Sequence, residues 1–165
     1  MTICRTRFTP DEVAGLTDEM TRICRRDMDT PEITHCRTVT MLCFGEKPLF
    51  TVEFGAAAHA AGGQSVSGDA LDQFCDTSGR AQMLLCDGMG TGRAAAVDGQ
   101  MAAKLTAQLL RAGFAAESAA RLVNVALGLK GAEQEAGATL DLLTVDLYTG
   151  RAGLFKAGAA PSFLV

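Results

Sequence analysis

A turn-forming run with an Asp placed symmetrically on either side restricts how this chain can fold. The run is Asp76-Thr77-Ser78-Gly79-Arg80, and residues of these types favour a chain reversal. If a hairpin is centred on Ser78, directly opposed residues are equally distant from it, so Asp69 faces Asp87. The sequence therefore predicts two antiparallel strands that bring these two carboxylates together at one end of one face.

Two opposed carboxylates need a partner. Opposed strand residues have Cβ atoms roughly 4.5–5.5 Å apart, and two ionised carboxylates that close repel each other. A shared proton or a bound divalent cation would relieve the repulsion. Gly68 and Gly88 favour the cation, because they leave room for a hard ion and for backbone carbonyl ligands. The alternative is that Asp87 caps a helix after a glycine-rich turn, with Asp69 in a separate loop.

The remaining pattern predicts an α+β domain with an antiparallel sheet and a helical hairpin. Helices are expected where apolar residues recur with helical spacing, and strands where they alternate or run between turn signals. The expected helices are 9–23, 91–111 and 115–127, and the expected strands are 37–44, 50–54, 140–147 and 151–156. Gly62 and Gly63 are expected to form a loop.

Charge and composition exclude several classes of protein. The chain has 15 Lys+Arg against 19 Asp+Glu, which argues against nucleic acid as a partner, because no basic surface is available for phosphates. No apolar run reaches the roughly 18–20 residues of a membrane span, and the start lacks a secretory signal. We therefore expect a cytoplasmic segment without membrane contact. The six cysteines form no CxxC pair, which argues against a structural zinc site. Their even number could suggest disulfides, but without a sign of secretion we expect reduced thiols.

Four motifs, in order and spacing, resemble the phosphatase domain of the stage II sporulation protein E family, within the PPM class of metal-dependent serine/threonine phosphatases. The likeness is strongest over 50–165 and weaker over 1–49, and we expect one domain over 1–165. The motifs are Val66-Ser67-Gly68-Asp69, Leu84-Leu85-Cys86-Asp87-Gly88-Met89-Gly90-Thr91-Gly92, Ala138-Thr139-Leu140-Asp141-Leu142 and Lys156-Ala157-Gly158-Ala159-Ala160-Pro161-Ser162-Phe163.

The resemblance implies an αββα sandwich and a site with two Mn²⁺ or Mg²⁺ ions. Asp69 would bridge both ions, and Asp87 and the Gly88 carbonyl would be further ligands. The implied reaction is attack on phosphorus by a metal-held hydroxide. The implied substrate and partner is a phosphorylated anti-anti-sigma factor, whose dephosphorylation activates a sporulation sigma factor.

The family pattern continues beyond Pro161 with Ser-Asp-Gly and Asp-Asp motifs that complete its metal site. The chain printed here ends at Val165, so we expect the front part of an incomplete domain whose parent protein can be membrane-anchored. We further expect weak metal binding, little activity by the isolated chain, and an exposed apolar edge near 163–165. Such an edge favours poor solubility or a homodimer.

Other interpretations stay open from sequence. One is a non-catalytic, phosphatase-like module that binds a phosphoprotein of an anti-sigma pathway. Another is an independent α+β domain with a calcium-stabilised loop. Asp141 and Asp146 could be mistaken for the missing ligands, and we expect Asp141 to have a supporting role instead. The helices over 91–127 either shift the metal loop in a regulatory step or simply pack on the sheet.

Overall fold

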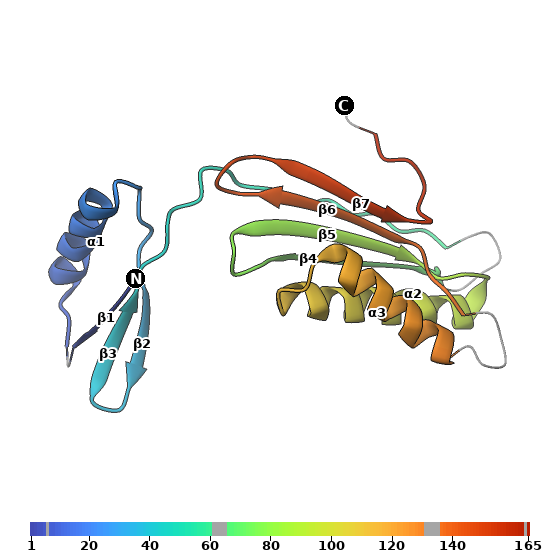
Figure 1. Ribbon diagram of the computed structural model, residues 1–165, viewed down its shortest axis with the longest axis horizontal. Helices are drawn as coiled ribbons and strands as arrows, with labels where there is room; N and C mark the ends of the chain where they lie inside the picture. Colours follow the sequence, from blue (N-terminus) through green and yellow to red (C-terminus); the bar gives the residue numbers. More distant parts are fainter. Residues whose placement is uncertain (6, 61–65, 131–135, 164) are drawn as a thin grey trace. The chain divides into compact units, whose positions relative to one another are not determined.

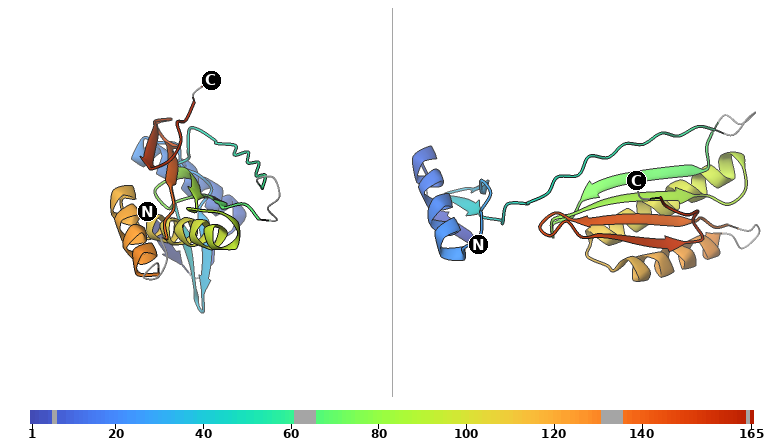
Figure 2. Two further views of the ribbon diagram at one scale, coloured as in Figure 1. Left: turned by 90° about the vertical axis from the view of Figure 1, so that its right-hand side faces the viewer. Right: turned by 90° about the horizontal axis from the view of Figure 1, so that it is seen from above.

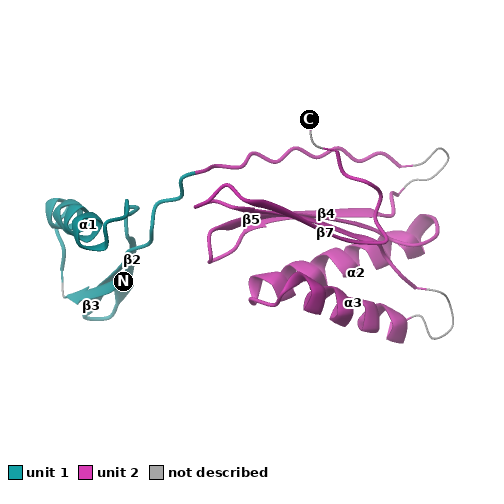
Figure 3. Cartoon of the chain, turned by 45° about the horizontal axis from the view of Figure 1, so that its top comes forward, with its two compact units in different colours: residues 1–49 teal, residues 50–165 magenta. Residues whose placement is uncertain are grey.

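A computed structural model describes residues 1–5, 7–60, 66–130, 136–163 and 165. These residues form two compact units, 1–49 and 50–165 (Figure 3). The expectation of one domain over 1–165 stays a prediction, and each unit is described by itself below. Among the described residues, no helix is long and apolar enough to cross a membrane.

The first unit is a three-stranded antiparallel sheet with one helix against it (Figure 1). Its elements are β1 (Thr2–Arg5), α1 (Pro10–Cys24), β2 (Glu32–Cys36) and β3 (Val39–Cys43), and the strand order is β1-β3-β2. The predicted first helix is confirmed. It begins at a capping box in which Thr9 and Glu12 bond each other's backbone N–H, which satisfies two of the free N–H groups at a helix start.

Apolar side chains of α1 and the sheet form the small core of this unit. Met20, Leu42 and Phe44 are buried there, and Ile3 and Leu16 pack against them. The strand expected over 37–44 is present as β3, which is shorter at both ends. β1 and β2 have no counterpart among the predicted strands, because each is a short segment that gains its ladder hydrogen bonds only by pairing with β3.

The second unit is a four-stranded antiparallel sheet with two helices on one face, which the views of Figure 2 also show. The strand order is β4-β5-β6-β7. The elements are β4 (Asp69–Cys75), β5 (Arg80–Asp87), α2 (Gly92–Arg111), α3 (Ala116–Lys130), β6 (Leu140–Asp146) and β7 (Ala152–Ala157). The predicted helical pair and the predicted hairpin over 140–156 are therefore confirmed, and so is the α+β class with antiparallel sheets.

The two faces of this sheet differ. Side chains that point towards the helices are buried, including Leu84, Cys86 and Leu142. They meet small residues of α2, such as Ala103 and Ala107, which allow the helix to approach the sheet closely. The opposite face, called the outer face below, carries Asp69 and Asp87 at one end.

The strand predicted over 50–54 is wrong. Residues 50–60 form no strand, although the Phe50 N–H donates to the Leu147 carbonyl at 2.9 Å. Val52 and Phe54 are half-buried while Thr51 and Glu53 are exposed. The alternation that suggested a strand thus reflects partial burial without a ladder of hydrogen bonds. The loop predicted at Gly62 and Gly63 lies outside the described residues.

Candidate metal site

The hairpin has the register that the sequence predicts. Asp69 is opposite Asp87, and all the other pairs of β4 and β5 are equally distant from Ser78. The turn is held by Asp76, whose side chain accepts hydrogen bonds from the Ser78 and Arg80 N–H groups. Gly79 has φ of +72°, a left-handed conformation that favours glycine. A local turn therefore places the two carboxylates on neighbouring strands.

Both aspartates are exposed at the end of the outer face. The Ser67 hydroxyl donates to Asp69 Oδ2 at 3.0 Å and accepts from the Asp69 N–H at 3.2 Å, which orients that carboxylate. Asp87 is held through its backbone, because its N–H donates to Thr139 Oγ1 and its carbonyl accepts from the Thr139 N–H. Within the described ranges, no hydrogen bond to the Asp87 carboxylate is formed, so its oxygens are available to a ligand.

The glycines next to the aspartates bring further oxygen atoms to the same place. A Cβ atom on Gly68 would lie 3.2 Å from Asp87 Oδ1 and 3.3 Å from the Gly88 carbonyl oxygen. These two oxygens therefore converge beside Gly68. A Cβ atom on Gly88 would lie 1.9 Å from the Ala95 carbonyl, so the backbone of α2 leaves no room for a side chain there. Glycine is required at position 88 by close packing.

Carboxylate and carbonyl oxygens are the ligands that Mg²⁺ and Ca²⁺ prefer. Asp69, Asp87 and the Gly88 carbonyl could supply three such ligands, so the donor set fits a hard divalent cation. Among the described residues, no group of three or more His, Cys, Asp or Glu side chains is placed to hold a metal ion. This pair of carboxylates leaves most of an octahedral shell to water, so weak binding is expected.

Asp141 lies on the same face. It is opposite Leu85, which precedes Asp87 by two residues on β5. Its Oδ2 accepts from the Lys156 ammonium group on β7 and from the Ser162 hydroxyl at 3.4 Å. Asp141 is therefore neutralised by an ion pair, which agrees with the supporting role expected for it. Lys156 also donates to the Ala160 carbonyl at 2.6 Å, so it ties the segment after β7 to the sheet.

Asp146 has a different local role. Its carboxylate accepts from the Tyr148 and Thr149 N–H groups at 2.9 and 2.8 Å. These hydrogen bonds, that of Thr149 above all, lower the pKa of Asp146. The Asp146 carboxylate therefore stabilises the turn between β6 and β7.

Sequence reasoning missed the role of Thr139, because its partner Asp87 is 52 residues away. It also missed Lys156, although this residue belongs to the same predicted hairpin as Asp141 and lies directly opposite it.

Comparison with known proteins finds a family profile and relatives that have the same description. The family profile of Stage II sporulation protein E (SpoIIE) matches residues 77–165. Stage II sporulation protein E of Priestia megaterium is 32% identical over 121 residues, which are 73% of this chain and 20% of that protein. The protein of the same description from Bacillus subtilis is 31% identical over 130 residues, which are 79% of this chain and 16% of that protein. The chain thus spans a fifth or less of these relatives.

A solved structure has the same fold. It contains the PP2C phosphatase domain and a fragment of the regulatory domain of the cell fate determinant SpoIIE from Bacillus subtilis. The TM-score is 0.61 at 22% identity, over 96% of this chain and 53% of that one. At this identity the likeness establishes the fold, and it confirms the PPM-type architecture expected from the sequence.

Proposed function

The chain belongs to the stage II sporulation protein E (SpoIIE) family, and on this premise we propose that it forms part of a metal-dependent protein serine phosphatase domain. The observation that carries the proposal is the opposition of Asp69 and Asp87 beside the Gly88 carbonyl. Asp87 Oδ1 and the Gly88 carbonyl oxygen lie beside Gly68, and Asp69 is opposite Asp87 at the exposed end of the sheet. Oxygen ligands of this kind suit catalysis by bound divalent ions better than catalysis through a nucleophilic side chain.

Each residue has a defined part in this proposal. Asp69, oriented by Ser67, would bridge two Mn²⁺ or Mg²⁺ ions, and Asp87 and the Gly88 carbonyl would hold one of them. Such ions supply positive charge and an activated water for hydrolysis of a phosphate ester. Asp87 can hold its position because its backbone is hydrogen-bonded to that of Thr139, which directly precedes β6.

For the substrate we propose the phosphoserine of an anti-anti-sigma factor, in the activation of a sporulation sigma factor in the cytoplasm. The support is membership of the SpoIIE family together with the net charge of −4, which disfavours nucleic acid. A homodimer is a second proposed partner, and the exposed leucines of the outer face support it.

An alternative function is a phosphatase-like module that binds the phosphoprotein without turnover. The observation that favours it is the small ligand set, because two carboxylates and one carbonyl bind a divalent ion weakly. The two functions share the docking of a phosphoprotein and differ in whether phosphate is released.

Calorimetric titration of the 165-residue chain with Mn²⁺ tests the site. We expect weak binding that Asp69→Ala abolishes, whereas Asp72→Asn, on the same strand but the opposite face, leaves it unchanged. Binding that survives Asp69→Ala would overturn the proposed site. Tight binding of two ions with multiple turnovers on a phosphoserine peptide would show instead that Asp141 or Asp146 supplies ligands.

A longer protein that contains this chain distinguishes enzyme from binding module. An enzyme should release phosphate from a phosphoserine substrate only with Mn²⁺ or Mg²⁺, and Asp69→Ala should abolish the release. Metal-dependent capture of the phosphoprotein without release would favour the module. Hydrolysis that needs no metal and tolerates Asp69→Ala would exclude the mechanism.

A further inference from the structure

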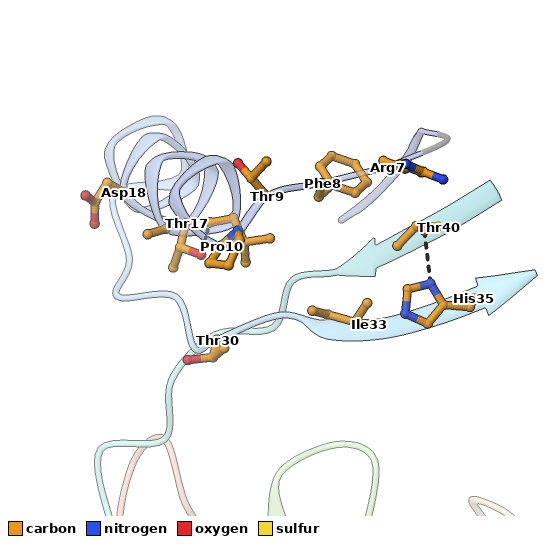
Figure 4. A pocket seen from close by; sticks show the side chains of 12 residues that line it. Arg7, Phe8, Thr9, Pro10, Thr17, Asp18, Thr30, Ile33, His35 and Thr40 are labelled. Atoms are coloured by element: carbon orange, nitrogen blue, oxygen red, sulfur yellow. Dashed lines mark hydrogen bonds between the residues drawn. The ribbon is translucent and has the colours of Figure 1, made fainter.

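The first unit contains a cleft of about 700 Å³ between α1 and the edge of its sheet (Figure 4). One helix is about 10 Å wide and strands are spaced by about 4.8 Å, so one helix covers about two strands. The core contacts of α1 are with Ile3 of β1 and Leu42 of β3. The edge strand β2 is left uncovered, and its Ile33 is 50% exposed. The cleft therefore follows from the width of the sheet.

The middle of the cleft is apolar. Phe8, Pro10 and Val13 line it on the helix side, and Ile33 lines it on the strand side. The Thr17 hydroxyl, which also faces the cleft, already donates to the Val13 carbonyl at 2.9 Å. This part of the cleft can thus bury the hydrocarbon body of a ligand without leaving one of these polar groups unpaired.

One end of the cleft is polar and positively charged. The His35 Nδ1 and Thr40 Oγ1 atoms are hydrogen-bonded at 3.0 Å, which fixes the imidazole ring. Its second nitrogen points into the cleft, on the side of Ile33 (Figure 4). Arg7 lines the same end. In the part of the chain that the structure describes, Arg7 forms no ion pair, whereas Arg5 is paired with Glu12 at 2.8 Å.

The acidic residue of the cleft lies at the other end. Asp18 is on α1, and its carboxylate is directed away from His35 and Arg7 (Figure 4). An anion at this end would therefore have the Arg7 guanidinium and the His35 imidazole, and no carboxylate, among the side chains that line the cleft. Hydrogen bonds between ionised partners are about twice as strong as neutral ones, so this end favours a negatively charged group.

We propose that this cleft binds a small amphipathic carboxylate. The apolar body would lie between Val13 and Ile33, and the carboxylate would accept hydrogen bonds from His35 and Arg7. The volume lies within the roughly 300–1,000 Å³ of small-molecule sites, which combine apolar walls with a few orienting polar groups. This site lies within the first unit and is independent of the proposed phosphatase function.

Calorimetric titration of the 165-residue chain with 4-phenylbutyrate tests the proposal, with neutral 4-phenylbutyramide as the matched ligand. We expect saturable binding of the carboxylate with a dissociation constant of about 1 mM or tighter. Arg7→Gln and His35→Gln should each weaken it roughly tenfold, the value of one charge-assisted hydrogen bond. Neither substitution should change the weaker binding of the amide.

Two controls keep the test decisive. His59→Gln alters the other histidine of the chain, which does not line the cleft, and should leave carboxylate binding unchanged. In the unaltered chain, NMR should show the His35 imidazole signals shifting on titration while those of His59 stay constant. Equal affinity for carboxylate and amide, absence of saturable binding, or shifts at His59 in place of His35 would each overturn the proposal.

Discussion

Asp69 and Asp87 determine the electrostatics at the exposed end of the hairpin. They are directly opposed, and like charges in that arrangement destabilise a pair of strands. Neither carboxylate forms an ion pair within the described residues. A bound cation would turn this repulsion into attraction, so the stability of the chain should report on the site independently of any catalysis.

Asp69→Asn should therefore stabilise the metal-free chain by about 0.2–1 kcal/mol, because it removes one of two opposed charges. Mn²⁺ should raise the stability of the original chain and have little effect on the variant. Urea unfolding with and without Mn²⁺ measures both effects. Asp72→Asn is the control, since Asp72 is paired with Arg111 at 3.5 Å and its loss should not stabilise the chain. A destabilised Asp69→Asn variant would contradict the repulsion.

Cys86 shows how burial changes an ionisable group. It is fully buried between the sheet and α2, and burial raises the pKa of its thiol to about 12. In the unfolded chain the thiol ionises near its ordinary pKa, so the unfolded state loses this proton first as the pH rises. The stabilising contribution is thus complete below the ordinary pKa and is lost between that value and about 12.

The free energy of unfolding of the original chain should therefore fall relative to that of Cys86→Ala by about 1 kcal/mol between pH 8.5 and pH 10. Because the two chains share all other titrating groups, the difference between their unfolding free energies reports on Cys86 alone. Urea unfolding at a series of pH values gives the difference. A difference that stays constant with pH would show that the native thiol ionises as readily as the unfolded one.

Among the helices, α2 packs directly against the backbone of Gly68 and Gly88, next to Asp69 and Asp87. A Cβ atom on Gly99 would lie 2.2 Å from the Gly68 carbonyl oxygen, so helix and loop are in direct backbone contact. Asp98, next to Gly99, is only 5% exposed and accepts a hydrogen bond of 2.5 Å from Lys130 at the end of α3. This ion pair links the two helices beside the candidate site.

Lys130→Met should destabilise the chain by about 1–3 kcal/mol, because it leaves the buried Asp98 carboxylate without its partner. Lys130→Arg should restore much of the loss. The matched control is Arg121→Met, which breaks an exposed pair with Glu117 on the same helix and should change stability by at most about 0.5 kcal/mol. Thermal or urea unfolding measures all three variants. Equal effects at Lys130 and Arg121 would contradict the linking role.

At the scale of the whole molecule, the outer face of the four-stranded sheet is apolar and exposed. Leu71, Leu85 and Leu154 on this face are 40%, 42% and 55% exposed, and Phe163 nearby is 87% exposed. A groove of about 340 Å³ lies between Leu85, Leu154 and Phe163. Contiguous apolar surface of this kind promotes association or low solubility, as the sequence led us to expect.

The chain should therefore self-associate with rising concentration, and Leu154→Lys should weaken this association. Sedimentation equilibrium measures it. Ile23→Lys is the control, because Ile23 is also exposed, at 60%, but lies on α1 in the other unit. A monomer at all concentrations, or an equal effect of both substitutions, would show that the outer face does not mediate association.

Elements whose interactions are local could be predicted from the sequence. The turn around Asp76 sets the register of β4 and β5, since one residue of slippage would move every side chain to the opposite face. The helical periodicity over 91–111 and the Thr9 cap determine helices in the same way. The opposition of Asp69 and Asp87 could thus be predicted, because it depends on only nineteen consecutive residues.

Features that depend on partners distant in sequence follow only from the packing of the folded chain. Phe50 and its neighbours alternate as a strand does, yet form none, because alternation reports burial and does not supply a pairing strand. The ion pair of Asp98 with Lys130 and the cleft beside His35 join segments that no local pattern connects. Local periodicity specifies an element and its faces, whereas the choice of which faces meet is made by packing of the whole chain.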